Sequence, residues 1–234
     1  MSAEDQDDRA RDGRSTRWDP HRRERRERIV QAAIQAIEVH GPDVLTGQIA
    51  ELAGVPRTHV YRHFDGKPAL DLAVSTQVAL EIGSHIRSAF VAGASTVELI
   101  GGAIDRHLSW VAEHPNLYRF LARNAFAMST PAGRPADAKA AFAGEITALT
   151  ARYMAALGLS TEPAERMIVG VVGLVDATAS WWIERRVPDR ATVAAELTDE
   201  VWLIIERASR QLGATLDPHL PLPEISPTAG RAPR

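Results

Sequence analysis

Cysteine is absent from all 234 residues, which excludes disulfide bonds, thiolate zinc sites and cysteine nucleophiles. Long hydrophobic runs are absent too. The longest apolar stretch, residues 167–175, is interrupted by Gly170 and Gly173 and stops at Asp176, far short of the ~20 apolar residues that a membrane span needs. The polar N-terminal segment has no apolar signal-peptide core. These absences predict a soluble, cytoplasmic protein that does not enter a membrane.

Enzyme signatures are missing as well. The sequence has no convincing pair of catalytic carboxylates, no Ser-His-Asp signature and no phosphate-loop spacing. Its composition is ordinary for a protein with a hydrophobic core, since 45% of the residues are hydrophobic and 24% are charged. We therefore expect a globular protein that is not an enzyme and needs no cofactor.

Positive charge is concentrated near one end of the chain. The net charge of −3 argues against a protein that coats nucleic acid indiscriminately. Between residues 11 and 28, however, eight arginines face only four acidic residues. Such a local basic patch suits contact with phosphates at one end of the molecule. The arginines of this patch are Arg11, Arg14, Arg17, Arg22, Arg23, Arg25, Arg26 and Arg28.

Apolar residues recur at helical spacing through most of the chain. Ile29, Ala32, Ala33, Ala36 and Ile37, for example, follow the i, i+3, i+4, i+7, i+8 pattern of one buried helix face. Strand-like alternation and repeats of about 20–50 residues are absent from the sequence. The patterning therefore predicts an all-α fold. The expected helices span residues 22–40, 46–53, 56–63, 67–91, 97–114, 117–126, 142–157, 163–186 and 193–212.

The second and third expected helices form a helix-turn-helix. The tight turn at Gly54 and Val55 sets two short helices at a steep angle. The third helix is only about two turns long but is rich in polar groups, which makes it a poor choice for burying a core. It is a good choice for a groove lined with hydrogen-bond acceptors. These polar groups belong to Arg57, Thr58, His59, Tyr61, Arg62 and His63.

The segment from Thr46 to Pro68 resembles the DNA-binding signature of the TetR (tetracycline-repressor-like) family. The matching residues agree in type and spacing, and the resemblance covers roughly residues 25–75. They are Thr46, Ile49-Ala50, Ala53-Gly54-Val55, Tyr61, His63-Phe64 and Lys67, with Gly41 five residues before Thr46. The resemblance implies a helix-turn-helix domain followed by a larger helical bundle that binds a ligand and dimerises.

The resemblance also implies roles for the polar side chains. Thr46, Tyr61, His63 and Lys67 would hold phosphates. Hydroxyl, phenol and cationic groups all donate to phosphate oxygens. Arg57, Thr58 and His59 would face base edges, with Arg57 the first choice because its fork pairs with guanine O6 and N7. The sequence departs from the family at two positions. Pro56 replaces the usual Ser or Thr, and Thr58 stands where Gly is frequent.

Two alternatives stay open for these residues. His59 and His63 are one helical turn apart, a spacing that can hold a metal, but no third ligand is evident on that face, so we predict no metal site. The arginines between residues 22 and 28 either form a solvated helix start with Glu24 and Glu27 or contact DNA phosphates. The segment 11–17 could enter a minor groove.

The remaining expectations concern the bundle. By resemblance, its last two helices pair with those of a second copy, where Gly170 and Gly173 permit close approach. A small-molecule effector, by default an apolar or aromatic one, would bind inside the bundle. Core packing is the alternative role of the apolar candidates, and a surface position that of Asp176. The candidate ligand-binding residues are Trp110, Tyr118, Phe120, Met128, Phe142, Met154, Asp176 and Trp181.

We therefore expect a disordered arm over residues 1–21, a helix-turn-helix DNA-binding domain over 22–66, a ligand-binding and dimerisation domain over 67–213 and a Pro-rich tail over 214–234. The expected function is transcriptional repression. A homodimer would bind double-stranded DNA at a palindromic operator and leave it when the effector binds. A helical interaction or ligand-binding module without specific DNA binding is the alternative.

Overall fold

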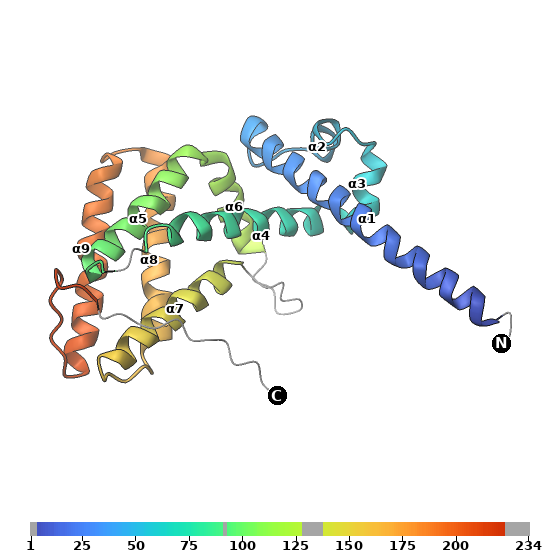
Figure 1. Cartoon of the computed structure of the whole chain (residues 1–234). Coiled ribbons are helices and arrows are strands. Elements are labelled where there is room, and N and C mark those ends of the chain that lie inside the picture. The colour runs from blue at the N-terminus through green and yellow to red at the C-terminus, as the bar shows by residue number, and fades with distance from the viewer. Residues whose placement is uncertain (1–3, 91–92, 128–137, 223–234) are drawn as a thin grey trace. The chain divides into compact units, whose positions relative to one another are not determined.

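The structure, a computed structural model, describes residues 4–90, 93–127 and 138–222, and it confirms the all-α fold for this part of the chain (Figure 1). Nine helices make up its regular structure. They are α1 (Glu4–His40), α2 (Thr46–Leu52), α3 (Arg57–His63), α4 (Gly66–Arg87), α5 (Thr96–Glu113), α6 (Pro115–Ala127), α7 (Ala138–Ala156), α8 (Ala164–Arg185) and α9 (Arg190–Gln211).

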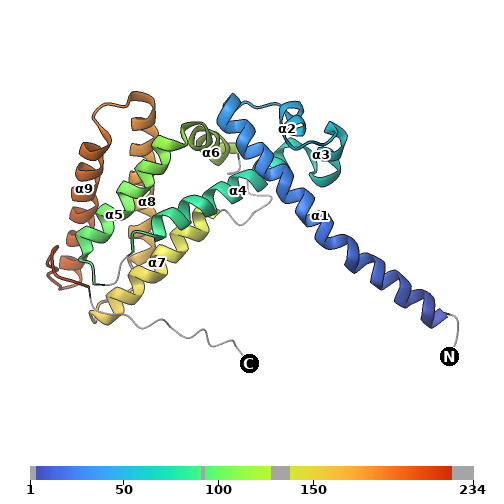
Figure 2. The same ribbon diagram turned by 45° about the horizontal axis from the view of Figure 1, so that its top comes forward.

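The first helix begins far earlier than the sequence predicts. We expected an arm before residue 22, whereas α1 starts at Glu4 and runs as one continuous helix (Figures 1 and 2). The physical reason is that apolar periodicity reports a buried face rather than helical structure itself. Residues 21–28 of α1 are all exposed, so this part of the helix leaves no apolar pattern in the sequence.

The chain folds as two compact units, whose boundary differs from the one expected after residue 66. The first unit contains α1, α2, α3, α4 as far as Val78, and α6. The second contains the rest of α4 with α5, α7, α8 and α9. Contacts distant in sequence place α6 with α1. The side-chain amide of Asn116 donates to the Glu38 carbonyl at 2.8 Å, and Arg123 Nη1 donates to both carboxylate oxygens of Asp43 at 2.7 Å.

The core of the first unit is built where α1 packs against α2 and α3. Ile29 and Ile37 of α1, Ile49 of α2 and Val60 of α3 are buried there, and Phe64, directly after α3, is buried as well. The expected apolar face of the first helix is therefore the face that holds the short helices.

In the second unit α5 packs against α8 and α9, and α7 packs against α8 (Figure 2). Leu108 of α5 and Leu197 of α9 are among its fully buried side chains. The chain after α9 also belongs to this unit. Its backbone pairs with the start of α5, because Val97 N–H donates to the Pro218 carbonyl at 3.3 Å and Leu222 N–H to the Ala94 carbonyl at 3.2 Å. The predicted Pro-rich tail is thus anchored as far as residue 222, and residues 223–234 lie outside the described residues.

Helix α8 combines an apolar composition with unusual exposure. By length and composition alone it is the one helix of the described residues that could cross a membrane, yet only 22% of its most apolar window is buried. Val169, Gly173, Ala177 and Trp181, spaced four residues apart, are all exposed and lie along one face. A Cβ added at Gly173 would meet nothing within 4 Å.

Candidate nucleic-acid interface

The turn between α2 and α3 locks the two helices together. The Val55 N–H donates to the Ala50 carbonyl at 3.0 Å, and Gly54 adopts a left-handed φ of 64° that a side chain would disfavour. Ala50 and Ala53 are buried against this turn. The helix-turn-helix predicted from the sequence is therefore present and rigidly joined.

Helix α3 buries a single residue and exposes the rest of its surface. Val60 is its buried residue. The remaining side chains are exposed or half-buried, as a helix that enters a DNA groove requires. The exposed ones are Arg57, Thr58, Tyr61 and Arg62, and the half-buried ones are His59 and His63. These are the six polar residues that the sequence placed on this helix.

A hydrogen-bonded cluster joins the start of α2 to α3. Thr46 is the first residue of α2, and its side chain hydrogen-bonds the Tyr61 phenol. Arg57 Nη2 also donates to the phenol oxygen at 3.4 Å, with its guanidinium carbon 5.8 Å from the ring centroid. The hydrogen bond with Thr46, and next that from Arg57, lowers the pKa of Tyr61. Tyr61 is 45% exposed, so the cluster presents its hydrogen-bonding groups at the surface, as the predicted phosphate contacts of Thr46 and Tyr61 require.

The contact with Tyr61 also affects how Arg57, the predicted base-reading residue, could reach a base. In the absence of DNA, Arg57 lies against Tyr61, so a contact with a base edge requires its side chain to swing away from the phenol. That motion is inexpensive because both groups are exposed. Base reading by Arg57 stays a prediction.

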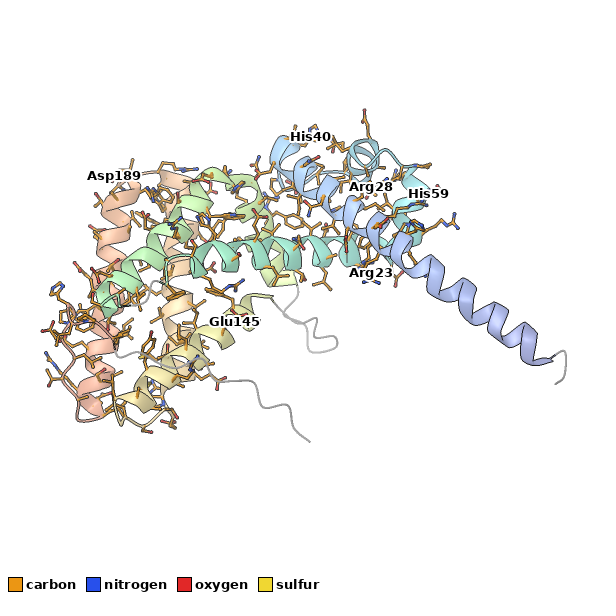
Figure 3. The ribbon with its side chains drawn as sticks, in the orientation of Figure 1. Arg23, Arg28, His40, His59, Glu145 and Asp189 are labelled. Atoms are coloured by element: carbon orange, nitrogen blue, oxygen red, sulfur yellow. The ribbon has the colours of Figure 1, made fainter. Side chains whose placement is uncertain are left out.

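A second cluster of positive charge surrounds His63. Burial, first of all, and then the charges of Arg22 and Arg25 on α1 lower the pKa of His63. His59 and Arg62 of α3 add smaller effects of the same sign. The basic face of α3 therefore continues onto α1. The arginine-rich segment is evident in the sequence, but the spacing of its residues does not show which arginines lie beside α3. Figure 3 labels Arg23 and Arg28 on the same segment, and His59 on α3.

The expected phosphate contact Lys67 is placed differently from the residues of α3. It lies in the first turn of α4, half-buried, and forms an ion pair with Asp71. Its ammonium also lies 5.9 Å from the centroid of the Phe120 ring. A phosphate bound by Lys67 has to compete with the Asp71 carboxylate.

Comparison with known proteins identifies the family. The model of bacterial regulatory proteins of the tetR family matches residues 29–74, and that of the tetracyclin repressor-like C-terminal domain matches residues 97–204. An HTH-type transcriptional regulator of Mycobacterium tuberculosis (strain H37Rv) is 34% identical over 181 residues, which are 75% of this chain and 75% of that one. The chain belongs to the TetR family. It is a transcriptional regulator with a helix-turn-helix DNA-binding domain, as the resemblance predicted.

Solved structures of TetR-family regulators share the fold. One from Streptomyces coelicolor has a TM-score of 0.62 at 20% identity, covering 82% of this chain and 86% of its own. The transcriptional regulator FadR from Bacillus subtilis, solved in complex with stearoyl-CoA, has a TM-score of 0.55 at 16% identity, covering 75% of this chain and 96% of its own. At these identities the likeness concerns the fold alone.

The candidate ligand-binding residues of this TetR-family chain are divided between the two units. Tyr118 and Phe120 are buried in the first unit, while Trp110 and Met154 are buried in the second. The other candidates in the second unit are half-buried or exposed, and Met128 lies outside the described residues. The half-buried ones are Phe142 and Asp176, and the exposed one is Trp181.

Two further observations come from the structure alone. Among the described residues no group of three or more His, Asp or Glu side chains could hold a metal ion. The pair His59 and His63 therefore has no third ligand of this kind beside it within the described chain. The indole N–H of Trp110 is buried and has no hydrogen-bond partner within the described chain. A buried donor of this kind is costly unless an acceptor reaches it.

Proposed function

We propose that this TetR-family regulator is a cytoplasmic homodimeric repressor, which binds a palindromic DNA operator and is released from it by a small, largely apolar effector. The observation that carries the DNA part is the surface of α3, where one buried residue anchors a helix whose other side chains are hydrogen-bond donors. The adjoining arginines of α1 supply the positive charge that phosphates attract.

The exposed face of α8 supports the homodimer. An apolar face that its own chain leaves open needs a partner, and the two glycines on α8 let another helix approach closely. On α9, Leu203 is 60% exposed. A second copy that brings its own α8 and α9 would bury both faces by two-fold symmetry. This occupant accounts for the apolar helix without placing the protein in a membrane.

Two-fold symmetry also explains how so short a helix can be specific. One α3 reaches only a few base pairs, so two half-sites about one DNA turn apart are needed. Within each half-site we assign Arg57, Thr58 and His59 to base edges, and Thr46, Tyr61, His63 and Lys67 to phosphates. Arg62 contributes charge to the same surface.

The effector is proposed to bind in the C-terminal helical domain. The apolar candidate side chains favour an apolar or aromatic molecule, and Trp110 offers a buried donor for a carbonyl or carboxylate oxygen. The FadR structure with stearoyl-CoA is a precedent for such a ligand in this fold. The effector would act by population shift, favouring a dimer whose reading helices no longer match successive major grooves.

Selection of bound sites from randomised duplex DNA, with the full-length protein at near-physiological salt, tests the proposal. We expect enrichment of a palindrome with half-sites about one helical turn apart. The salt concentration must be stated because phosphate contacts make affinity strongly salt-dependent. Folded, dimeric protein that enriches no sequence would favour the helical module without specific DNA binding.

His63 makes the proposed phosphate contact pH-dependent. Burial, and then the surrounding charges of Arg22, Arg25, His59 and Arg62, lower the pKa of His63 in the free protein, which favours the neutral imidazole. A phosphate beside it would raise that pKa, so binding takes up protons. We expect operator affinity to rise as the pH falls through about 6.5. The slope of log affinity against pH corresponds to the uptake of up to about one proton per subunit. Titrations at constant ionic strength measure this slope.

Two histidine variants test whether the pH dependence of DNA binding comes from His63 or from another titrating group. His63→Gln is expected to flatten the slope, while His219→Gln, at the far end of the chain, leaves it unchanged. Free-protein stability runs in the opposite direction. The unfolded chain holds more protons below pH 6.5, so lowering the pH through this range reduces the free energy of unfolding. An unaltered slope in His63→Gln would remove His63 from the phosphate contacts.

A further inference from the structure

Arg26 connects α1 to the end of the reading helix. Its Nη1 donates to the main-chain carbonyl of His63, the last residue of α3, at 2.7 Å. Its guanidinium carbon lies 4.1 Å from the centroid of the Phe64 ring. The two contacts fall on adjacent residues, so one planar side chain holds both the final carbonyl of α3 and the aromatic ring that follows it.

The end of α3 has particular need of such a contact. A helix of seven residues is marginal by itself, and its last carbonyls have no partner within the helix. Phe64 ends α3 in an extended conformation, with φ −134° and ψ 134°, and its ring is buried. A guanidinium also complements the negative end of the helix dipole. Arg26 therefore acts at the point where the helix stops.

We propose that Arg26 is a positioning residue for DNA recognition, which fixes the C-terminal end of α3 against α1. This inference rests on the proposed function, since it assigns to Arg26 the orientation of the helix that reads the operator. Arg26 acts through His63 and Phe64 rather than through the bases. It differs in this from Arg22 and Arg25, whose charges surround His63.

Substitutions of Arg26 distinguish the effect of its geometry from the effect of its charge. Arg26→Lys keeps the positive charge but loses the planar fork that hydrogen-bonds and stacks at once. Arg26→Ala loses both. Arg23 is an exposed arginine of the same helix segment, so Arg23→Ala is the matched control for the loss of one positive charge.

Hydrogen exchange of the full-length protein without DNA tests the contact itself. We expect amides of residues 60–66 to exchange about tenfold faster in Arg26→Ala and Arg26→Lys, because a charge-assisted hydrogen bond and a ring contact are lost. Arg23→Ala should exchange as the wild type does. Cooperative thermal unfolding of each variant shows that the fold is retained. Unchanged exchange in Arg26→Ala would overturn the proposal.

DNA binding tests the consequence, on the selected operator and on an unrelated duplex over a range of salt. We expect Arg26→Lys to lose about tenfold in operator affinity while its binding to unrelated DNA and its salt slope stay at the wild-type value. Arg23→Ala should change both duplexes alike or neither. Full recovery of operator affinity in Arg26→Lys would show that charge alone matters. Wild-type protein that prefers no sequence would refute the recognition role together with the proposed function, and the exchange result would still report on the contact.

Discussion

Val169→Glu is expected to convert the dimer into a folded monomer and to abolish operator binding. Val169 is 60% exposed on the apolar face of α8, so a carboxylate there is solvated in the single chain. In the proposed dimer, two-fold symmetry would bury two such carboxylates in one interface. Each unpaired buried charge costs several kcal/mol, so the dimer should weaken by about a thousandfold or more. Sedimentation equilibrium measures the change in dimer dissociation.

Leu80→Glu is the control for this substitution. Leu80 is a comparably exposed apolar residue on α4, outside the proposed interface. Leu80→Glu should leave the dimer and its DNA affinity intact.

A monomeric Val169→Glu protein offers a single α3. Loss of the dimer should therefore also remove the contact with the second half-site, and with it specific DNA binding. A Val169→Glu protein that remains dimeric would place the interface away from this face of α8.

Arg57→Ala is expected to relax the sequence preference at one position in each half-site. An arginine paired with guanine contributes about 1–3 kcal/mol of discrimination, and a palindrome counts it twice. Site selection repeated with the variant shows which position loses its preference. Competition between operators that differ only at that base pair then measures the size of the effect at fixed salt.

Lys67→Ala is the comparison that separates the two kinds of contact. As a phosphate contact, Lys67 should contribute equally to every sequence, and its loss should reduce the salt slope by about one. If Arg57→Ala instead weakens all sequences alike, then Arg57 acts with Tyr61 on a phosphate. The hydrogen bond between Arg57 and Tyr61 already holds these two side chains together, so both could contact the same phosphate.

Much of the fold was predictable because its signals are local. Gly41 and Pro42 mark the end of the first helix, and the turn at Gly54 separates the second and third. The polar residues of α3 could be named in advance, since a helix with one apolar residue has one buried side. Family membership followed from the same short segment, where residue type and spacing suffice.

Local signals could not predict the long N-terminal part of α1 or the division of the chain into units. Residues 21–28 of α1 are exposed and need no apolar stripe. Helix α6 joins the first unit through contacts of Asn116 and Arg123 with residues about eighty positions earlier. Hydrophobic periodicity shows that a helix has a buried face but does not name the helix that covers it.

By itself, then, the sequence determined the helical class, the helix-turn-helix and the set of donors on α3, because each depends on residues within a turn or two of one another. Only the tertiary structure decided which of those donors meet. It brought Thr46 to Tyr61, Arg22 and Arg25 to His63, and Arg26 to the end of α3. The physical reason is that such neighbours are set by the angles at which helices pack, and those angles depend on the shapes of whole buried surfaces rather than on the spacing of residues along one helix.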